Sequence, residues 1–212
     1  MNAMAYNPSK GLVDLFGGMD DMKNHVIRCV GDPMERFQED ALRIMRAVRF
    51  SAQLGFAIDD STRQAITALA PNLKYVSAER IQAELVKLLT SPHPDYFRVA
   101  YETGITREFL PEFDACMETE QNTPHHCYTV GEHILHSTLN VPADKVLRLT
   151  MLFHDIAKPL MKTTDENGCD HFKKHAEKGE TVVKGILRRL KFDNDTIDKV
   201  TRLVRWHDER PE

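Results

Sequence analysis

The amino-acid sequence predicts a mainly α-helical fold, with a helical bundle followed by a second all-helical domain and a short β segment at the N-terminus. Apolar residues recur at helical spacing through most of the chain. Proline and glycine punctuate these patterns at intervals that suit separate helices. One short stretch near the N-terminus alternates in the manner of a strand, and we find no internal repeat or low-complexity segment.

The composition is that of a globular protein. The 212 residues include 28 Lys and Arg against 32 Asp and Glu, a net charge of −4, with 42% hydrophobic and 28% charged residues. These proportions exclude disordered, collagen-like and coiled-coil chains. No apolar run approaches the ~18 residues of a membrane span, and the N-terminus lacks a secretory signal. We therefore expect a cytoplasmic protein without a membrane partner, in which four scattered cysteines form neither a disulfide framework nor a cysteine zinc site.

The strand signal lies at residues 12–16, where apolar side chains alternate with Asp14 and the pattern ends at Gly17 and Gly18. One strand does not make a sheet. We expect it to pair outside this chain, or to belong to a domain whose earlier part is missing, so that the chain is a truncated piece of a longer protein. Asp14 either turns into solvent or takes part in catalysis, and the sequence favours neither role.

A long helix is predicted from Asp32 to about Gly55. Asp32 is a suitable N-cap, Pro33 suits the first helical position, and Glu35 completes the spacing of a capping box. Its apolar face comprises Phe37, Ala41, Ile44, Met45, Val48 and Ala52.

More helices follow in both halves of the chain. We expect them at about residues 61–70, 77–89 and 94–103, the last closed by Gly104. Residues 121–124 then read as a linker. Helical patterns resume near Thr129, Lys145, Ala176 and Thr196, so the second half is predicted to be another all-helical domain.

The polar face of the helix at 32–55 gathers Arg36, Asp40 and Arg43. A carboxylate only accepts hydrogen bonds and a guanidinium only donates them, so Asp40 and Arg43, one turn apart, can imitate the edge of a complementary base. Cytosine and adenine fit this pair, whereas uracil and guanine leave polar groups unpaired at roughly 1–3 kcal/mol each. The alternative is an ordinary surface ion pair worth ~0.2–0.5 kcal/mol.

Several ordered segments resemble the bacterial class II tRNA nucleotidyltransferases, the CCA-adding enzymes and bacterial poly(A) polymerases. The motif E-D-A-L-R at 39–43 matches the family's E-D-x-x-R element, which implies that Asp40 and Arg43 are the template for incoming CTP and ATP. Arg36, Arg46 and Arg49 belong to the same matched region and are expected to help bind the nucleotide. The resemblance covers roughly residues 2–110 and rests on segments 2–8, 11–18, 27–33, 36–43, 46–50 and 79–85.

The family's phosphate loop and D-x-D pair are not found in this chain. In the family, these elements lie before the matched region and hold the nucleotide phosphates and two Mg²⁺ ions. Phosphoryl transfer depends on such metals. We therefore expect no catalytic residue for transfer within this chain, Mg²⁺ ligands upstream of it, and no nucleotide addition by the chain alone.

A second group of residues carries metal-ligand chemistry. Imidazole and carboxylate are suitable ligands for a divalent transition metal, and the H-D dipeptide at 154–155 is followed by a helix stop at Pro159. A lone histidine is usually structural, whereas several histidines at separated helical positions around an H-D dipeptide favour a metal site. The motif H-D-I-A-K-P resembles the HD domain, a metal-dependent phosphohydrolase fold. The resemblance implies the ligands His133, His154, Asp155, His175 and His207.

The family's last aspartate normally follows the final histidine by some distance, and Asp208 is too close to His207 to be expected in that role. We therefore expect the HD domain to be truncated at its C-terminus. Lys158 either steadies a phosphate or is a solvated charge. Six basic residues either line RNA or form a solvated face: Lys184, Arg188, Arg189, Lys191, Arg202 and Arg205.

Together these observations predict three segments: a remnant of the nucleotidyltransferase head at 1–28, nucleotide-selecting neck and body helices at 29–120, and an HD domain at 121–212. The expected function is part of an enzyme that adds CMP and AMP from CTP and ATP to a tRNA 3′ end. Two alternatives remain, a stand-alone HD phosphohydrolase and a non-catalytic RNA-binding module.

Overall fold

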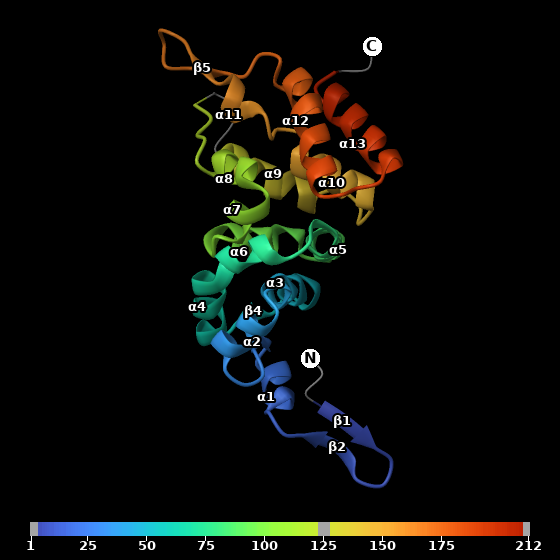
Figure 1. Cartoon of the computed structure of the whole chain (residues 1–212). Helices are drawn as coiled ribbons and strands as arrows, with labels where there is room; N and C mark the ends of the chain where they lie inside the picture. The colour runs from blue at the N-terminus through green and yellow to red at the C-terminus, as the bar shows by residue number, and fades with distance from the viewer. Residues whose placement is uncertain (1–3, 123–127, 210–212) are drawn as a thin grey trace.

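The computed structural model describes residues 4–122 and 128–209. The chain forms an elongated stack of helices, with a β hairpin at one end and the last two long helices at the other (Figure 1). The prediction of a mainly α fold is confirmed. No helix within the described ranges is long and apolar enough to cross a membrane.

The N-terminal segment is a β hairpin, β1 Met4–Asn7 paired antiparallel with β2 Gly11–Asp14. The strand therefore has a partner within the chain, at residues 4–7, which the sequence pattern did not predict. The alternative that it belongs to a domain whose earlier part is missing stays a prediction. Asp14 ends the hairpin, and its carboxylate accepts the backbone N–H groups of Gly18 (2.9 Å) and Met19 (2.8 Å) in the first turn of α1 Gly18–Lys23. Its observed role is structural.

The long helix predicted from Asp32 to Gly55 is two helices, α2 Pro33–Glu39 and α3 Leu42–Leu54. Asp32 caps α2 by accepting the N–H of Met34, as predicted. Asp40 is extended, with φ −151° and ψ 102°, and its Oδ1 accepts the N–H of Leu42 at 3.1 Å. A short acidic side chain that binds a nearby backbone N–H competes with the helical pattern, which explains the break at this residue.

The helices predicted at about 61–70, 77–89 and 94–103 are observed at 60–69, 78–89 and 94–102, whereas the short helices at 105–109 and 111–117 were not predicted. Helix α3 packs against α5, and the two short strands β3 and β4 pair in parallel. The elements are β3 Val26–Ile27, β4 Ala57–Ile58, α4 Asp60–Leu69, the 3₁₀ helix η1 Ala70–Tyr75, α5 Ala78–Leu89, the 3₁₀ helix η2 Pro94–Tyr96, α6 Phe97–Glu102, α7 Ile105–Phe109 and α8 Pro111–Met117.

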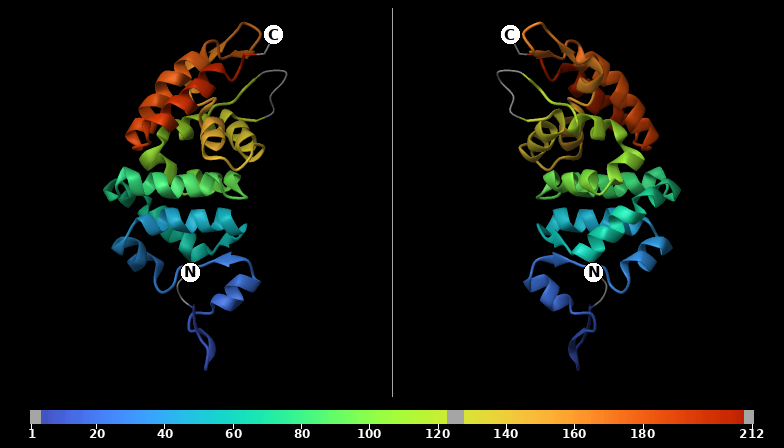
Figure 2. Two further views of the ribbon diagram at one scale, coloured as in Figure 1. Left: turned by 90° about the vertical axis from the view of Figure 1, so that its right-hand side faces the viewer. Right: turned by 90° about the vertical axis from the view of Figure 1, so that its left-hand side faces the viewer.

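The second half is also helical, as predicted, with one small antiparallel hairpin, β5–β6. Helices α12 and α13 run side by side and α10 packs against α9 and α13 (Figure 2). The elements are α9 Val130–Leu139, α10 Lys145–Phe153, α11 Lys158–Met161, β5 Thr163–Thr164, β6 Asp170–His171, α12 His175–Arg189 and α13 Asn194–Trp206.

One hydrophobic core runs through both halves, from Phe37 to Val204. Helix α10 of the second half packs on α5 of the first, and α9 packs on α8. The two halves approach closely at Gly131, where an added Cβ would lie 2.7 Å from the backbone Cα of Met117. Only a residue without a side chain lets α9 come this close to α8. The predicted linker at 121–124 therefore joins halves that share one core, although residues 123–127 lie outside the described ranges.

Candidate functional site

Five charged side chains gather around the break between α2 and α3, and we call them the neck cluster: Arg36, Glu39, Asp40, Arg43 and Arg80. Arg36 and Arg43 both donate to the Glu39 carboxylate, at 2.8 and 2.6 Å. Arg43 also donates to the backbone carbonyl of Arg36 at 2.9 Å. Arg80 at the start of α5 donates to Asp40 Oδ2 at 2.8 Å.

Asp40 and Arg43 are therefore not paired with each other in the structure, and each forms an ion pair with another residue. Arg43 pairs with Glu39 and Asp40 pairs with Arg80. Sequence reasoning missed Arg80, because it lies forty positions away, and it missed the role of Glu39. The side chains of Asp40 and Arg43 each remain 32% exposed, so both can meet a ligand.

The electrostatics of the cluster keep its carboxylates ionised. Partial burial disfavours the Asp40 carboxylate, but the hydrogen bonds from Arg80 and from the Leu42 N–H outweigh it and lower its pKa. The hydrogen bond from Arg43 is the largest cause of the lowered pKa of Glu39. An ionised Asp40 presents only acceptors, which suits an exocyclic amine.

The structure separates the two other arginines of α3 that were expected to bind nucleotide. Arg46 is exposed and lies 5.9 Å from the centre of the Phe50 ring. Arg49 is buried, with its Nε 2.5 Å from Glu84 Oε2 on α5 and its guanidinium 3.8 Å from the Phe50 ring centre. The expectation for Arg49 is corrected: because its side chain is only 10% exposed, it joins α3 to α5 and does not face a ligand.

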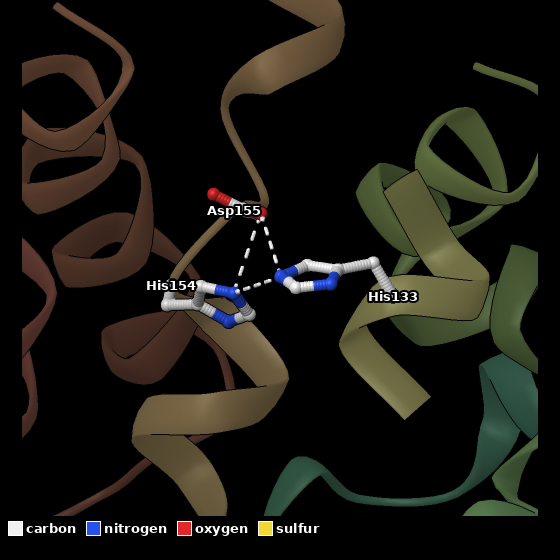
Figure 3. A group of neighbouring side chains, drawn as sticks. All are labelled: His133, His154 and Asp155. Atoms are coloured by element: carbon white, nitrogen blue, oxygen red, sulfur yellow. Dashed lines mark hydrogen bonds and ion pairs between the residues drawn. The ribbon is translucent and has the colours of Figure 1, made fainter. Parts of the chain in front are cut away.

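The five predicted metal ligands of the second half converge around Asp155. Figure 3 shows one side of this histidine centre, where His133 and His154 point toward Asp155. Their Nε2 atoms lie 3.5 and 3.3 Å from Asp155 Oδ2 and 3.2 Å from each other. On the other side, the Nε2 atoms of His175 and His207 lie 3.2 and 3.5 Å from Asp155 Oδ1.

Local structure brings these residues together from four places in the sequence. His133 lies within α9, His154 and Asp155 end α10, His175 begins α12, and His207 ends α13. Asp155 can point inward beside His154 because α10 ends there and the chain turns before α11. Sequence separation hides this convergence, which follows from packing α9, α10, α12 and α13 around one point.

The donor set fits a divalent cation. The Nδ1 atoms of His154, His175 and His207 lie 2.7–2.8 Å from the backbone carbonyls of residues three positions earlier. An Nδ1–H that donates to such a carbonyl leaves the lone pair of a neutral imidazole on Nε2, facing the centre. Asp155 Oδ1 is also buried, and it receives no hydrogen bond from the described residues when the imidazoles are neutral and carry their protons on Nδ1. Inward lone pairs beside an unsatisfied carboxylate oxygen are the arrangement that a metal ion would satisfy.

The same centre attracts positive charge. Burial disfavours the Asp155 carboxylate, but the charge and hydrogen bonding of His154, together with His175 and His207, hold its pKa well below its usual range. Burial also disfavours the His207 cation, yet its interactions with Asp155 and the Val204 carbonyl raise its pKa. A cation in the centre, whether protons on the imidazoles or a metal ion, is therefore favoured.

Two more residues complete the centre. Asp208 lies 3.1 Å from His175 Nε2 and 3.4 Å from His207 Nε2. Although Asp208 directly follows His207, its carboxylate reaches both imidazoles because the chain turns at the end of α13. The expectation that it is not the family's last ligand stays a prediction. Lys158 is buried and donates to Asp155 Oδ2 and to Gln121 Oε1, each at 2.9 Å, so it is not a solvated charge.

Comparisons with known proteins match the two halves of the chain to different families. Residues 55–117 match the family described as "Probable RNA and SrmB- binding site of polymerase A", and residues 124–212 match the HD domain. The CCA-adding enzyme of Lactobacillus helveticus is 45% identical over 125 residues, 58% of this chain and 31% of that protein. This chain is therefore similar to CCA-adding enzymes over part of their length.

Two further relatives extend the match. The CCA-adding enzyme of Leuconostoc mesenteroides is 54% identical over 89 residues, 42% of this chain and 22% of that protein. The crystal structure of the Bacillus stearothermophilus CCA-adding enzyme in complex with CTP superposes with a TM-score of 0.63 at 27% identity, covering 96% of this chain and 43% of that one. The chain thus spans under half the length of the proteins it matches.

Proposed function

We propose that this chain is the nucleotide-selecting and RNA-binding part of a tRNA nucleotidyltransferase that adds CMP and AMP from CTP and ATP. The observation that carries the proposal is the exposed neck cluster, in a chain whose fold matches an enzyme solved with CTP. We assign residues 1–28 to the catalytic head, 29–120 to the neck and body, and 121–212 to the HD domain. Free thiols at the three described cysteines suit a cytoplasmic protein.

Base selection in this proposal requires an exchange of ion pairs. The Asp40 carboxylate would release Arg80 to accept the exocyclic amine of cytosine or adenine, and Arg43 would release Glu39 to donate to a ring acceptor. These pairs are exposed and individually worth ~0–1 kcal/mol, so a base can displace them. Uracil and guanine would turn an oxygen toward Asp40 and leave it unpaired. Half-exposed Arg36 and exposed Arg46 would contact the phosphates.

Nucleotide binding tests the proposal directly. Isothermal titration of the 212-residue chain should show tighter binding of CTP and ATP than of UTP and GTP. Asp40→Ala and Arg43→Ala should remove that preference. Arg63→Ala is the matched control, because Arg63 forms an exposed pair with Glu102 on other helices. Equal affinity for all four nucleotides, or a preference unchanged in both variants, would refute the role of the neck cluster.

The RNA partner in this proposal is a tRNA 3′ end. The matched RNA-binding family model and the basic residues of α12 and α13 support it. The logarithm of the binding constant for a tRNA acceptor stem should fall linearly with the logarithm of salt concentration, as expected for phosphate contacts. We expect no nucleotide addition by the chain alone, with Mg²⁺ serving the transfer step through ligands outside it. Addition by the isolated chain would overturn this division of labour.

The histidine centre favours a second candidate function, a metal-dependent phosphohydrolase. His133 and His154 on one side of Asp155, with His175, His207 and Asp208 on the other, would hold divalent transition metal. When bound, such a cation supplies Lewis acidity toward a phosphoester and lowers the pKa of water. Lys158 orients the Asp155 carboxylate through an ion pair of 2.9 Å, and the backbone carbonyls fix the imidazole tautomers.

Phosphoester cleavage tests this second function. Hydrolysis of bis(p-nitrophenyl) phosphate and of 2′,3′-cyclic AMP should appear with added Mn²⁺, Ni²⁺ or Co²⁺ and should disappear in His154→Ala and Asp155→Asn. His136→Ala, on the same helix as His133, is the matched control. No turnover of either compound with any of the three metals would leave the centre with a structural role.

A further inference from the structure

The small hairpin β5–β6 carries a cluster of metal-ligating side chains outside the histidine centre. The hairpin projects beyond α11 and α12 at the end of the molecule (Figure 1). Thr163 pairs with His171 and Thr164 pairs with Asp170 across the two strands. The connecting turn holds Asp165 and Cys169, so an acid, a thiol and an imidazole meet at one end of the hairpin.

The turn fixes the Asp165 carboxylate. Its Oδ1 accepts the backbone N–H groups of Asn167 and Cys169 at 2.9 and 3.0 Å. The backbone closes the same turn, since the N–H of Asp165 donates to the Cys169 carbonyl at 2.9 Å. Gly168 takes a φ of 77°, which suits a glycine in a tight turn. These bonds leave Asp165 Oδ2 directed at His171 Nε2, 2.9 Å away.

The Cys169 thiol lies with them. A carboxylate oxygen of Asp165, the sulfur of Cys169 and an imidazole nitrogen of His171 are all within 4.8 Å of one another. Cys169 is a free, partly exposed thiol, so it is accessible to a metal ion. Thiolate, imidazole and carboxylate together are the donor types that bind Zn²⁺, and three of them leave a fourth position for water.

We propose that Asp165, Cys169 and His171 form a mononuclear zinc-type site, separate from the histidine centre. The sequence spacing does not indicate this site, because a cysteine zinc motif has two closely spaced cysteines. Here one cysteine is combined with an aspartate and a histidine. Its exposed position and three protein ligands make it an open site, in contrast with the closed four-ligand sites of structural zinc domains.

The hairpin is anchored, so the ligands are held in place before a metal arrives. The buried Asp170 accepts the N–H of Asn122 at 2.9 Å, and the Asp170 N–H donates back to the Asn122 carbonyl at 2.9 Å. Lys162 adds an ion pair to the same carboxylate at 2.8 Å. A rigid support lowers the ordering cost of binding.

The competing explanation is a simple ion pair between Asp165 and His171 with Cys169 as a bystander. The two explanations differ in the thiol. Only a metal site places Cys169 sulfur on the ion, and cobalt(II) reports a bound thiolate through a near-ultraviolet charge-transfer band. The described residues of the histidine centre include no cysteine ligand, so cobalt bound there gives no such band.

The experiment titrates the full chain with Co²⁺ under reducing, oxygen-free conditions, then displaces Co²⁺ with Zn²⁺. We expect a saturable thiolate-to-cobalt band that disappears in Cys169→Ser. His171→Asn and Asp165→Asn should weaken cobalt binding by at least ~100-fold, since even outer partners of ligands contribute 10–100-fold. Glu166→Gln, an exposed acid in the same turn, is the matched control and should bind as the unchanged chain does.

Two results would overturn the proposal: no charge-transfer band at millimolar cobalt, or a band that persists in Cys169→Ser. Persistence would assign the thiolate to another cysteine. Circular dichroism of each variant separates lost binding from lost folding. In His154→Ala the band should remain, because the two centres share no ligand.

Discussion

The buried ion pair between Arg49 and Glu84 gives a direct test of the structure. The pair joins α3 to α5 with both side chains about nine-tenths buried, and Arg49 also donates to Gln53 at 2.7 Å. Changing Glu84 to Gln leaves a guanidinium in the core without its counter-charge. Breaking a buried pair in this way costs about 3–5 kcal/mol. For a chain of this length that corresponds to a fall in Tm of roughly 6–20 °C.

The double variant Arg49→Met with Glu84→Leu separates charge from packing. Replacing both partners by apolar side chains of similar volume is often neutral or stabilising, so most of the lost stability should return. Urea denaturation followed by circular dichroism measures both effects. Arg63→Met with Glu102→Leu is the control, because that pair is exposed and is expected to contribute ~0–1 kcal/mol.

The same double variant tests the corrected role of Arg49. If Arg49 only joins two helices, the folded double variant should bind CTP as tightly as the unchanged chain. A loss of CTP affinity without a loss of stability would return Arg49 to the nucleotide site. A cost for Glu84→Gln below ~1 kcal/mol would refute the buried pair, since a typical core charge left unpaired costs several times more.

Three more predictions concern stability, and denaturant titration measures each. Gly131→Ala should destabilise by ~1–3 kcal/mol, because its Cβ would overlap the backbone of Met117; an unchanged midpoint would contradict the close approach of α9 to α8. Asp144→Ala should lower the free energy of unfolding by ~1 kcal/mol, because it removes the N-cap of α10. Asp144→Asn should keep most of that stability, because an asparagine side chain can also accept the capping hydrogen bond. Asp170, held by Lys162, has its pKa lowered to about 2 from 3.8. It should therefore stabilise by about 2 kcal/mol above pH 5, an amount lost as the pH falls from about 4 to 2. Asp170→Asn should lose this pH dependence, and equal slopes for both proteins would contradict it.

Helix positions were predictable because they depend on local patterns. The N-cap Asp32, the first-turn Pro33 and the αL glycine at Gly55 each specify a helix end by their own chemistry, and the structure has all three. The break at Asp40 was missed for a related reason. Its carboxylate can either face solvent on a continuous helix or bind the Leu42 N–H, and helical periodicity does not distinguish these states.

The candidate ligands were predictable only as residue types. His133 and His207 are 74 positions apart, and nothing local places them on the same centre. Asp208 was set aside because sequence distance stood in for spatial distance. Arg80 and Glu39 gave no separate signal, since surface charges on helices are common and become meaningful only when packing brings them to Asp40.

The amino-acid sequence by itself determined the helical class, most helix ends and the kinds of donor atom available, because these follow from side-chain chemistry within a few residues. Tertiary packing decided which donors share a centre, which arginine is buried and how the neck charges pair. Those outcomes depend on helices from distant segments burying one common core. The free energy of that burial depends on contacts between segments, so no single segment determines it.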